Sequence, residues 1–191
     1  MRLLLLLILI TALCPLKTYS QGCVAIKGTS GVCGRPSNAK GWELNLSNRY
    51  FKSYKHFVGA KEQKERVEKG TQVINHAYEL DITVTRVLNA KWSLAATVPV
   101  LYFKRSSLYE HDRITRHSTS SFGIGDTRIS AYRWMFNPAT SHKGNLQIGL
   151  GLKLPTGNYN YQDYFYKKAD SSVVAAVDQS IQLGDGGTGI T

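Results

Sequence analysis

The sequence predicts an all-β protein: an antiparallel up-and-down transmembrane β-barrel, incomplete in this chain, with about six strands present. Three observations predict it. The chain opens with an export signal, apolar residues then take every second position, and polar connections alternate between long and short. Successive side chains of a strand point to opposite faces, so such strands have one aliphatic and one polar face. Bacterial outer-membrane barrels show this pattern, with the aliphatic face toward lipid.

The first twenty residues have the layout of a secretory signal peptide. Arg2 precedes a nearly unbroken apolar run over residues 3–13. This run is shorter than the about 20 residues of a membrane-spanning helix, but it suits a signal peptide. Thr18 and Ser20 place small residues before a cleavage site at Gln21. The mature protein is therefore expected in the bacterial outer membrane.

The cysteines agree with export. A lipoprotein signal, with Cys14 or Cys23 lipidated, fits less well because the residues before them do not match that pattern. Cys23 and Cys33 lie in a Gly/Ser-rich stretch and are expected to form a disulfide in an oxidising compartment. A zinc site would need further ligands. The expected organisation is a signal peptide at 1–20, a Cys-containing segment at 21–40 and the barrel portion at 41–191.

The net charge of +11 raises the question of nucleic acid. Basic residues are scattered among acids and tyrosines rather than gathered, and an exported protein rarely meets nucleic acid. A basic outer surface fits anionic lipid better. The expected partners are outer-membrane lipid, lipopolysaccharide and a small-molecule solute, with no nucleic acid and no cofactor.

The first half of the barrel portion predicts three strands. The first covers residues 41–50, and the second covers 72–87. The polar segment between them contains AKEQKERVEK, which predicts a short solvated helix with Glu–Arg and Glu–Lys pairs at i,i+4. A short turn at 89–91 leads to the third strand, which begins at Trp92. The stretch 104–121 is predicted as a long polar loop.

The second half predicts three more strands. The fourth covers residues 122–136, and a turn at 137–144 leads to the fifth, around Leu146. A tyrosine-rich stretch at 158–178 is expected to be a long loop, and a sixth strand to start near Gln179. A soluble exported β-sandwich would also show alternating apolar and polar residues along its strands. It does not explain the alternation of long and short loops, or strands longer than ten residues. Six strands without a terminal aromatic are fewer than the eight of the smallest such barrels, so further hairpins are expected.

Strand parity then assigns side chains to two environments. The expected lumen-facing residues are Glu79, Asp81, Asp126, Arg128 and Lys153. The residues Leu80, Ile82, Ile148, Leu150 and Leu152 are expected to face lipid. The assignment is less direct for the fourth strand, where Tyr132 and Trp134 share the face of Arg128. A charged side chain facing lipid near the midplane costs about 2–4 kcal/mol, which favours the lumen for Arg128.

Three glycine-containing motifs resemble one family. The segments FGIGDTR at 122–128, GLGLKLPTG at 149–157 and LGDGGTG at 183–189 are similar to elements of the phenol-degradation meta-pathway transporter family of outer-membrane proteins. The tracts YRWMFNP and RYFKS resemble Bacteroidetes-type members. The resemblance covers most of the mature chain, as the N-terminal part of such a protein. It implies an outer-membrane barrel that passes small, apolar molecules, without catalytic residues.

Enzyme-like patterns are weaker. Gly184, Gly186 and Gly189 match a dinucleotide fingerprint by letter, but neither the helix nor the later acid that it requires follows. His111, Asp112 and His117 match no known metal spacing, so a solvated loop is preferred. No G-x-S-x-G element is present. An enzyme is therefore not expected.

The tyrosine cluster leaves two readings open. These residues either stack on a ligand or pack their loop against its neighbours. The candidate ligand contacts are Tyr159, Tyr161, Tyr164 and Tyr166. The expected function is an outer-membrane channel or transporter. The alternatives are a non-transporting structural or binding barrel in the outer membrane and a soluble exported carrier.

Overall fold

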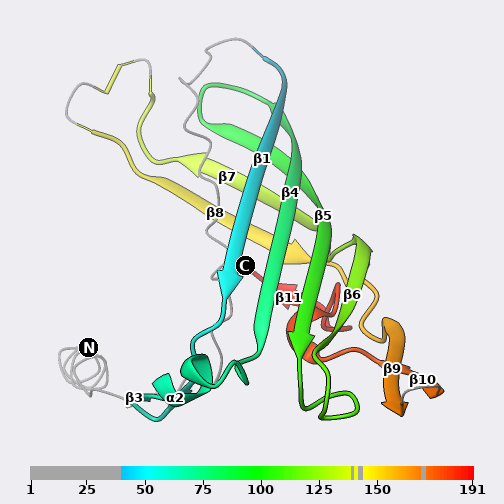
Figure 1. Ribbon diagram of the computed structural model, residues 1–191. Helices are drawn as coiled ribbons and strands as arrows, with labels where there is room; N and C mark the ends of the chain where they lie inside the picture. Colours follow the sequence, from blue (N-terminus) through cyan, green and yellow to red (C-terminus); the bar gives the residue numbers. More distant parts are fainter. Residues whose placement is uncertain (1–39, 139, 142–143, 169–170) are drawn as a thin grey trace, which may run out of the picture.

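The computed structural model describes residues 40–138, 140–141, 144–168 and 171–191 (Figure 1). It is dominated by one antiparallel seven-stranded sheet, in which β1, β4, β5, β7, β8 and β11 are successive neighbours. This order follows the chain, as in an up-and-down sheet. The predicted all-β fold is confirmed. Within the described residues the sheet is open, with β1 and β11 at its ends and no closure between them.

Three long strands begin the sheet. They are β1 (Gly41–Ser53), β4 (Ile74–Val87) and β5 (Trp92–Ser107), paired in continuous register. At 13, 14 and 16 residues, each exceeds the about 9–11 residues that a tilted strand needs to cross a bilayer. The tight turn between β4 and β5 is closed by Asn89, whose Oδ1 accepts hydrogen bonds from the backbone N–H groups of Lys91 and Trp92.

The connection from β1 to β4 contains small elements. A two-residue hairpin of β2 (Phe57–Val58) and β3 (Lys61–Glu62) precedes α2 (Lys64–Glu68). The short solvated helix predicted here is confirmed, and none of its residues is buried. No helix among the described residues is long and apolar enough to cross a membrane.

The predicted single strand at 122–136 is wrong. It is divided into β6 (His117–Ile124) and β7 (Arg128–Trp134), which pair with the second and first halves of β5. At residues 125–127 the ladder stops, opposite Pro99, which has no N–H to donate. Other segments bond this backbone instead, as described below. Because β5 runs on to Ser107, the loop at 108–116 is also shorter than expected.

The remaining strands correct the predicted end of the chain. After β8 (Gln147–Lys153) comes a hairpin of β9 (Gln162–Lys168) and β10 (Ser171–Ala176), in place of a structureless loop. The sixth strand does not start at Gln179. Asp178 caps a 3-10 turn there, η1 (Gln179–Ile181), by accepting from the Ser180 N–H. The strand is β11 (Gly189–Ile190), which pairs with β8.

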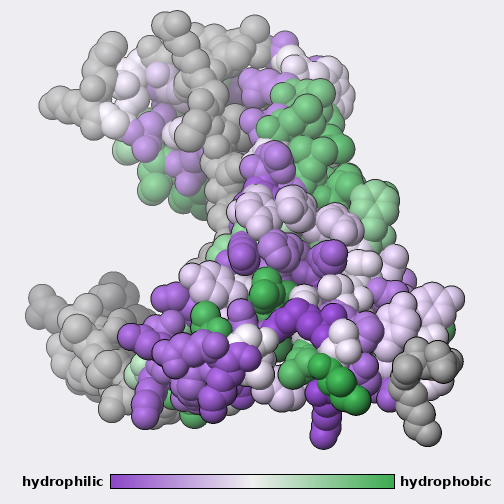
Figure 2. Space-filling view, in the orientation of Figure 1, coloured by the Kyte–Doolittle hydropathy of each residue, from purple (hydrophilic) through white to green (hydrophobic). Residues whose placement is uncertain are grey.

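The sheet has two chemically different faces. One, called the apolar face here, exposes aliphatic side chains that are neighbours across the strands. They include Leu44, Leu46, Leu80, Val84, Leu94, Ile129, Leu150 and Leu152, each more than a third exposed. Figure 2 shows hydrophobic side chains gathered over the upper part of the sheet, with hydrophilic ones around α2 and β3 at the lower end.

The opposite face, called the polar face, carries threonines, serines and charged residues, including the buried Glu79, Thr83 and Thr85. A small core lies on this face where the segment after β10 returns over β5 and β6. Leu101 and Ile181 are each 1% exposed, and Leu183 is also buried. The Ser121 hydroxyl donates to the Ile181 carbonyl and fixes this segment on the sheet.

Candidate functional site

Thr156, which follows β8, bonds the backbone on both sides of the interruption between β6 and β7. The Thr156 hydroxyl donates to the Gly125 carbonyl at 2.8 Å and accepts from the Thr127 N–H at 2.8 Å. The Gly125 N–H donates to the Pro99 carbonyl at 2.9 Å. Buried backbone groups need partners, and these bonds supply them where the ladder stops. One threonine therefore replaces sheet pairing on both sides of Asp126.

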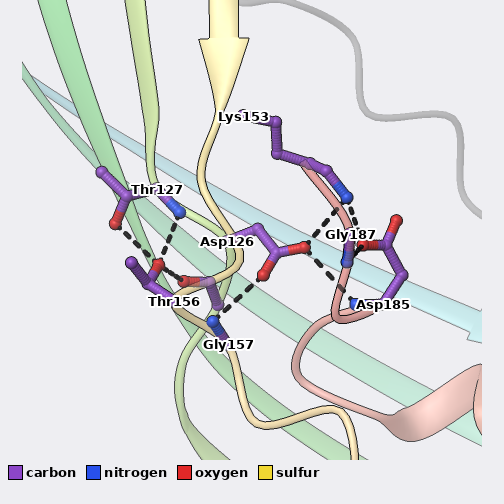
Figure 3. Close-up of polar contacts among 8 residues, drawn as sticks. Asp126, Thr127, Lys153, Thr156, Gly157, Asp185 and Gly187 are labelled. Carbon is purple, nitrogen blue, oxygen red and sulfur yellow. Dashed lines mark hydrogen bonds and ion pairs between the residues drawn. The ribbon is translucent and has the colours of Figure 1, made fainter. Parts of the chain in front are cut away.

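Asp126 lies at the centre of this arrangement, only 6% exposed (Figure 3). One carboxylate oxygen accepts from the Gly157 N–H at 3.0 Å. The other accepts from Lys153 Nζ at 3.2 Å and from the Asp185 N–H at 3.4 Å. A buried carboxylate is costly unless it is paired and hydrogen-bonded, and both requirements are met here. Asp126 thus connects three segments that are far apart in the sequence.

Two glycines allow this close approach. A Cβ on Gly157 would lie 2.4 Å from the Leu183 carbonyl oxygen, and one on Gly184 would lie 2.5 Å from an Asp126 oxygen. Backbone passes backbone at this point, so no side chain fits. We call this arrangement the motif junction and define it as Asp126, Lys153, Thr156, Gly157, Gly184 and Asp185. All three glycine-containing motifs of the sequence meet in it.

Lys153 links the two acids of the junction. Its ammonium contacts the buried Asp126 and the exposed Asp185, whose side chain is 61% exposed. Asp185 also accepts from the Gly187 N–H at 2.9 Å. Arg128 lies beside Lys153 in the β7–β8 register, on the polar face, and has no ion pair among the described residues. The junction therefore has a buried acid, Asp126, and an exposed acid, Asp185, joined by one ammonium group.

A comparison with family models identifies the family of this chain. Residues 58–181, about two thirds of the chain, match the family described as "Putative MetA-pathway of phenol degradation". The chain belongs to this family. The matched range includes Asp126, Lys153 and Gly157, and it agrees with the resemblance carried by the glycine motifs. No match to this chain is found among the curated proteins that were searched.

The other predicted lumen residues lie on the polar face but apart from the junction. Glu79 is 5% exposed and forms an ion pair with Arg49 of β1. Asp81 lies two residues further along β4, opposite Ser47 and Pro99. The register thus places these charged residues on one face, and their exposure to a lumen stays a prediction. Of the five, Asp126 and Lys153 form an ion pair with each other.

The four candidate tyrosines do not form one site. The Tyr159 ring lies against Gly186, and the Tyr161 N–H donates to the Gln182 side chain. Tyr164 is exposed on β9, whereas Tyr166 stacks on His117 with ring centroids 4.7 Å apart. No ring contact among the described residues joins two of these tyrosines. Tyr166 therefore shows loop packing, and ligand contact by the others stays a prediction.

The loop histidines were expected to be solvated, but His111 is 5% exposed. Its ring lies 5.1 Å from His117 and 5.3 Å from Phe165, and its Nδ1 accepts from the Tyr166 N–H. Burial, followed by the charge of His117, lowers the pKa of His111 below its ordinary 6.5. No group of three or more metal-ligating side chains is present in the described part of the chain. The cluster instead docks the β9–β10 hairpin.

The predicted disulfide of Cys23 and Cys33 and the signal peptide at 1–20 lie outside the described residues. Sequence reasoning did not select Thr156, Gly157 or Asp185 as site residues. The signal that could have found them was already visible, because all three belong to the glycine-containing motifs. Nothing in the sequence identified Arg49 as the partner of Glu79.

Proposed function

We propose that this chain forms the wall of an outer-membrane channel or transporter for small molecules. The observation that carries the proposal is the division of the sheet into an exposed aliphatic face and a polar face with paired charges. A soluble protein rarely exposes an apolar patch larger than a few hundred Å², whereas a sheet in a bilayer requires one. The role is passage of a solute, not catalysis.

Aromatic residues bound the apolar face at both ends, as in the girdles of membrane barrels. At one end, Tyr50, Tyr78, Tyr102 and Phe122 lie opposite one another across four strands, and we call them the tyrosine row. At the other end are Trp42 and Trp92, with the guanidinium groups of Arg86 and Arg133 over their rings.

The height of this band agrees with a membrane. Trp42 and Tyr50 are eight residues apart on β1. This separation is about 27 Å along a strand, or about 20 Å across the bilayer at a tilt of about 40°, comparable to an apolar band of about 25 Å. The tyrosine row adjoins the end with α2, the β9–β10 hairpin and η1. Because outer-membrane barrels carry their longer loops outside the cell, this end is assigned to the exterior.

The family description concerns phenol degradation, which supports small aromatic molecules as the solutes. The test is a swelling assay in phosphatidylcholine liposomes with the purified chain, using solutes graded in size and polarity, phenol among them. We expect faster entry of small solutes than in protein-free liposomes. Arg128→Ala on the polar face should change the solute profile, whereas Arg133→Ala on the apolar face of the same strand should not. A chain that stays monomeric and soluble without detergent would refute the membrane location.

A non-transporting barrel is the second candidate, and a specific observation favours it. The segment containing Ile181 and Leu183 lies on the polar face, where a lumen would be. This segment narrows any passage beside β5 and β6. If the inserted chain leaves liposomes impermeable to every solute tested, this second function replaces the first.

A further inference from the structure

A row of basic side chains crosses the apolar face directly beyond the tyrosine row. Lys52 lies opposite His76, and His76 lies opposite Lys104. Both lysines are exposed. We call these three residues the basic row. Ser120 of β6 is the next partner in register, so the row spans the three long strands and stops at β6.

The basic row is attached to the aromatic residues beside it. The Tyr50 hydroxyl and His76 Nδ1 are 2.8 Å apart, and the two rings stack with centroids 6.0 Å apart. The Lys52 ammonium lies over the ring of Tyr54, 5.6 Å from its centroid. These contacts orient the side chains without neutralising the lysines, because an aromatic ring carries no net charge.

Four carboxylates at this end of the sheet have other partners. Glu62 pairs with Lys55 at 3.3 Å, Glu110 and Asp178 pair with Arg105, and Asp163 accepts from the Ser120 N–H at 2.7 Å. Within the described part of the chain, neither Lys52 nor Lys104 has an ion pair. The row therefore presents uncompensated positive charge at the edge of an apolar surface.

The level of the row indicates what it meets. It lies two residues beyond the tyrosine row, about 7 Å along the strands. Aromatic girdles lie at the boundary between acyl chains and headgroups, so the next 7 Å is the headgroup layer.

We propose that the basic row binds the phosphate groups of lipopolysaccharide in the outer leaflet. The inference rests on the proposed outer-membrane function, which gives the apolar face its lipid and this end its exterior position. Phosphorylated headgroups carry the complementary charge, and their acyl chains would lie along the aliphatic side chains below the tyrosines. The site is thus a docking surface for one phosphorylated glycolipid.

The test measures binding of diphosphoryl lipid A to the whole chain in dodecyl maltoside micelles by native mass spectrometry. We expect Lys52→Gln/Lys104→Gln to weaken the apparent Kd about 25-fold, or about fivefold for each lysine near an anionic surface. The matched control, Lys61→Gln/Lys64→Gln, removes two exposed lysines from the same end of the molecule outside the row. It should change the Kd less than about twofold.

Three further arms decide the outcome. Lipid A without phosphates should bind the unaltered chain as weakly as diphosphoryl lipid A binds the Lys52/Lys104 variant. The proposal is overturned if both lipids bind the unaltered chain with equal affinity, or if both double variants lose equal affinity for diphosphoryl lipid A. It is also overturned if millimolar inorganic phosphate displaces lipid A. Insertion into pure phosphatidylcholine vesicles is scored separately by protease protection. Failure to insert refutes the membrane function, and the lipid site with it, whereas insertion without phosphate preference refutes the lipid site alone.

Discussion

Replacing Asp126 with alanine should destabilise the protein far more than replacing Asp185, the other acid that pairs with Lys153. The substitution leaves the Gly157 N–H without its acceptor at a buried position, where an orphaned donor costs about 1–3 kcal/mol. It also removes the charge-assisted bond to Lys153. Lys153 keeps Asp185, so its charge does not become unpaired. We expect the free energy of unfolding to fall by about 2–4 kcal/mol.

Asp185→Ala is the matched control, because Asp185 contacts the same ammonium with a side chain that is 61% exposed. Exposed ion pairs contribute about 0–1 kcal/mol, so the loss should stay below about 1 kcal/mol. Both variants are unfolded in urea from phosphatidylcholine vesicles, with tryptophan fluorescence as the signal. Equal losses in the two variants would show that burial of Asp126 does not anchor the junction.

Two further predictions concern local packing. Gly157→Ala should destabilise the chain because the new Cβ would lie 2.4 Å from the Leu183 carbonyl oxygen. In Gly187→Ala the atom nearest to the new Cβ would be 3.5 Å away, so this substitution should be tolerated. Similar urea midpoints for the two variants would contradict this. The lowered pKa of His111 means that its imidazole binds a proton more readily when the β9–β10 hairpin is undocked than when the hairpin is docked on it. Docking of the β9–β10 hairpin should therefore be strongest above pH 6.5 and should weaken as the pH falls from 6.5 toward the folded-state pKa of His111. The weaker docking would be measured as faster proteolysis of the hairpin. A His111→Gln variant with the same pH profile would refute this cause.

The long strands were predictable because their period is simple. In β1, β4 and β5 most side chains between the two aromatic ends follow the alternation, and the pairing register is continuous. Propensity and i,i+4 pairs likewise located the short helix before β4. These features depend on residues that are close in sequence, so a single sequence is sufficient to find them.

The errors occurred where distant segments decide the local structure. Residues 122–136 alternate well enough for one strand, but Thr156 and Leu154 bond the backbone groups of Gly125 and Thr127. Similarly, the residues near Gln179 form a capped turn because Arg105 of β5 holds Asp178 and Ser180. No local pattern contains these partners. Only the repeated glycines indicated that backbones meet closely there.

The motif junction gives the glycine-containing motifs a structural role. The Asp126 carboxylate positions both Gly157, which follows β8, and the returning segment at Asp185. This segment places Ile181 and Leu183 over the polar face, so the junction also sets how much of that face stays open to a solute. If so, Asp126→Ala should loosen the segment and widen the passage as well as lower stability. Solute entry that rises in liposomes while the strands remain folded would connect the junction to permeability, and unchanged entry would confine its role to stability.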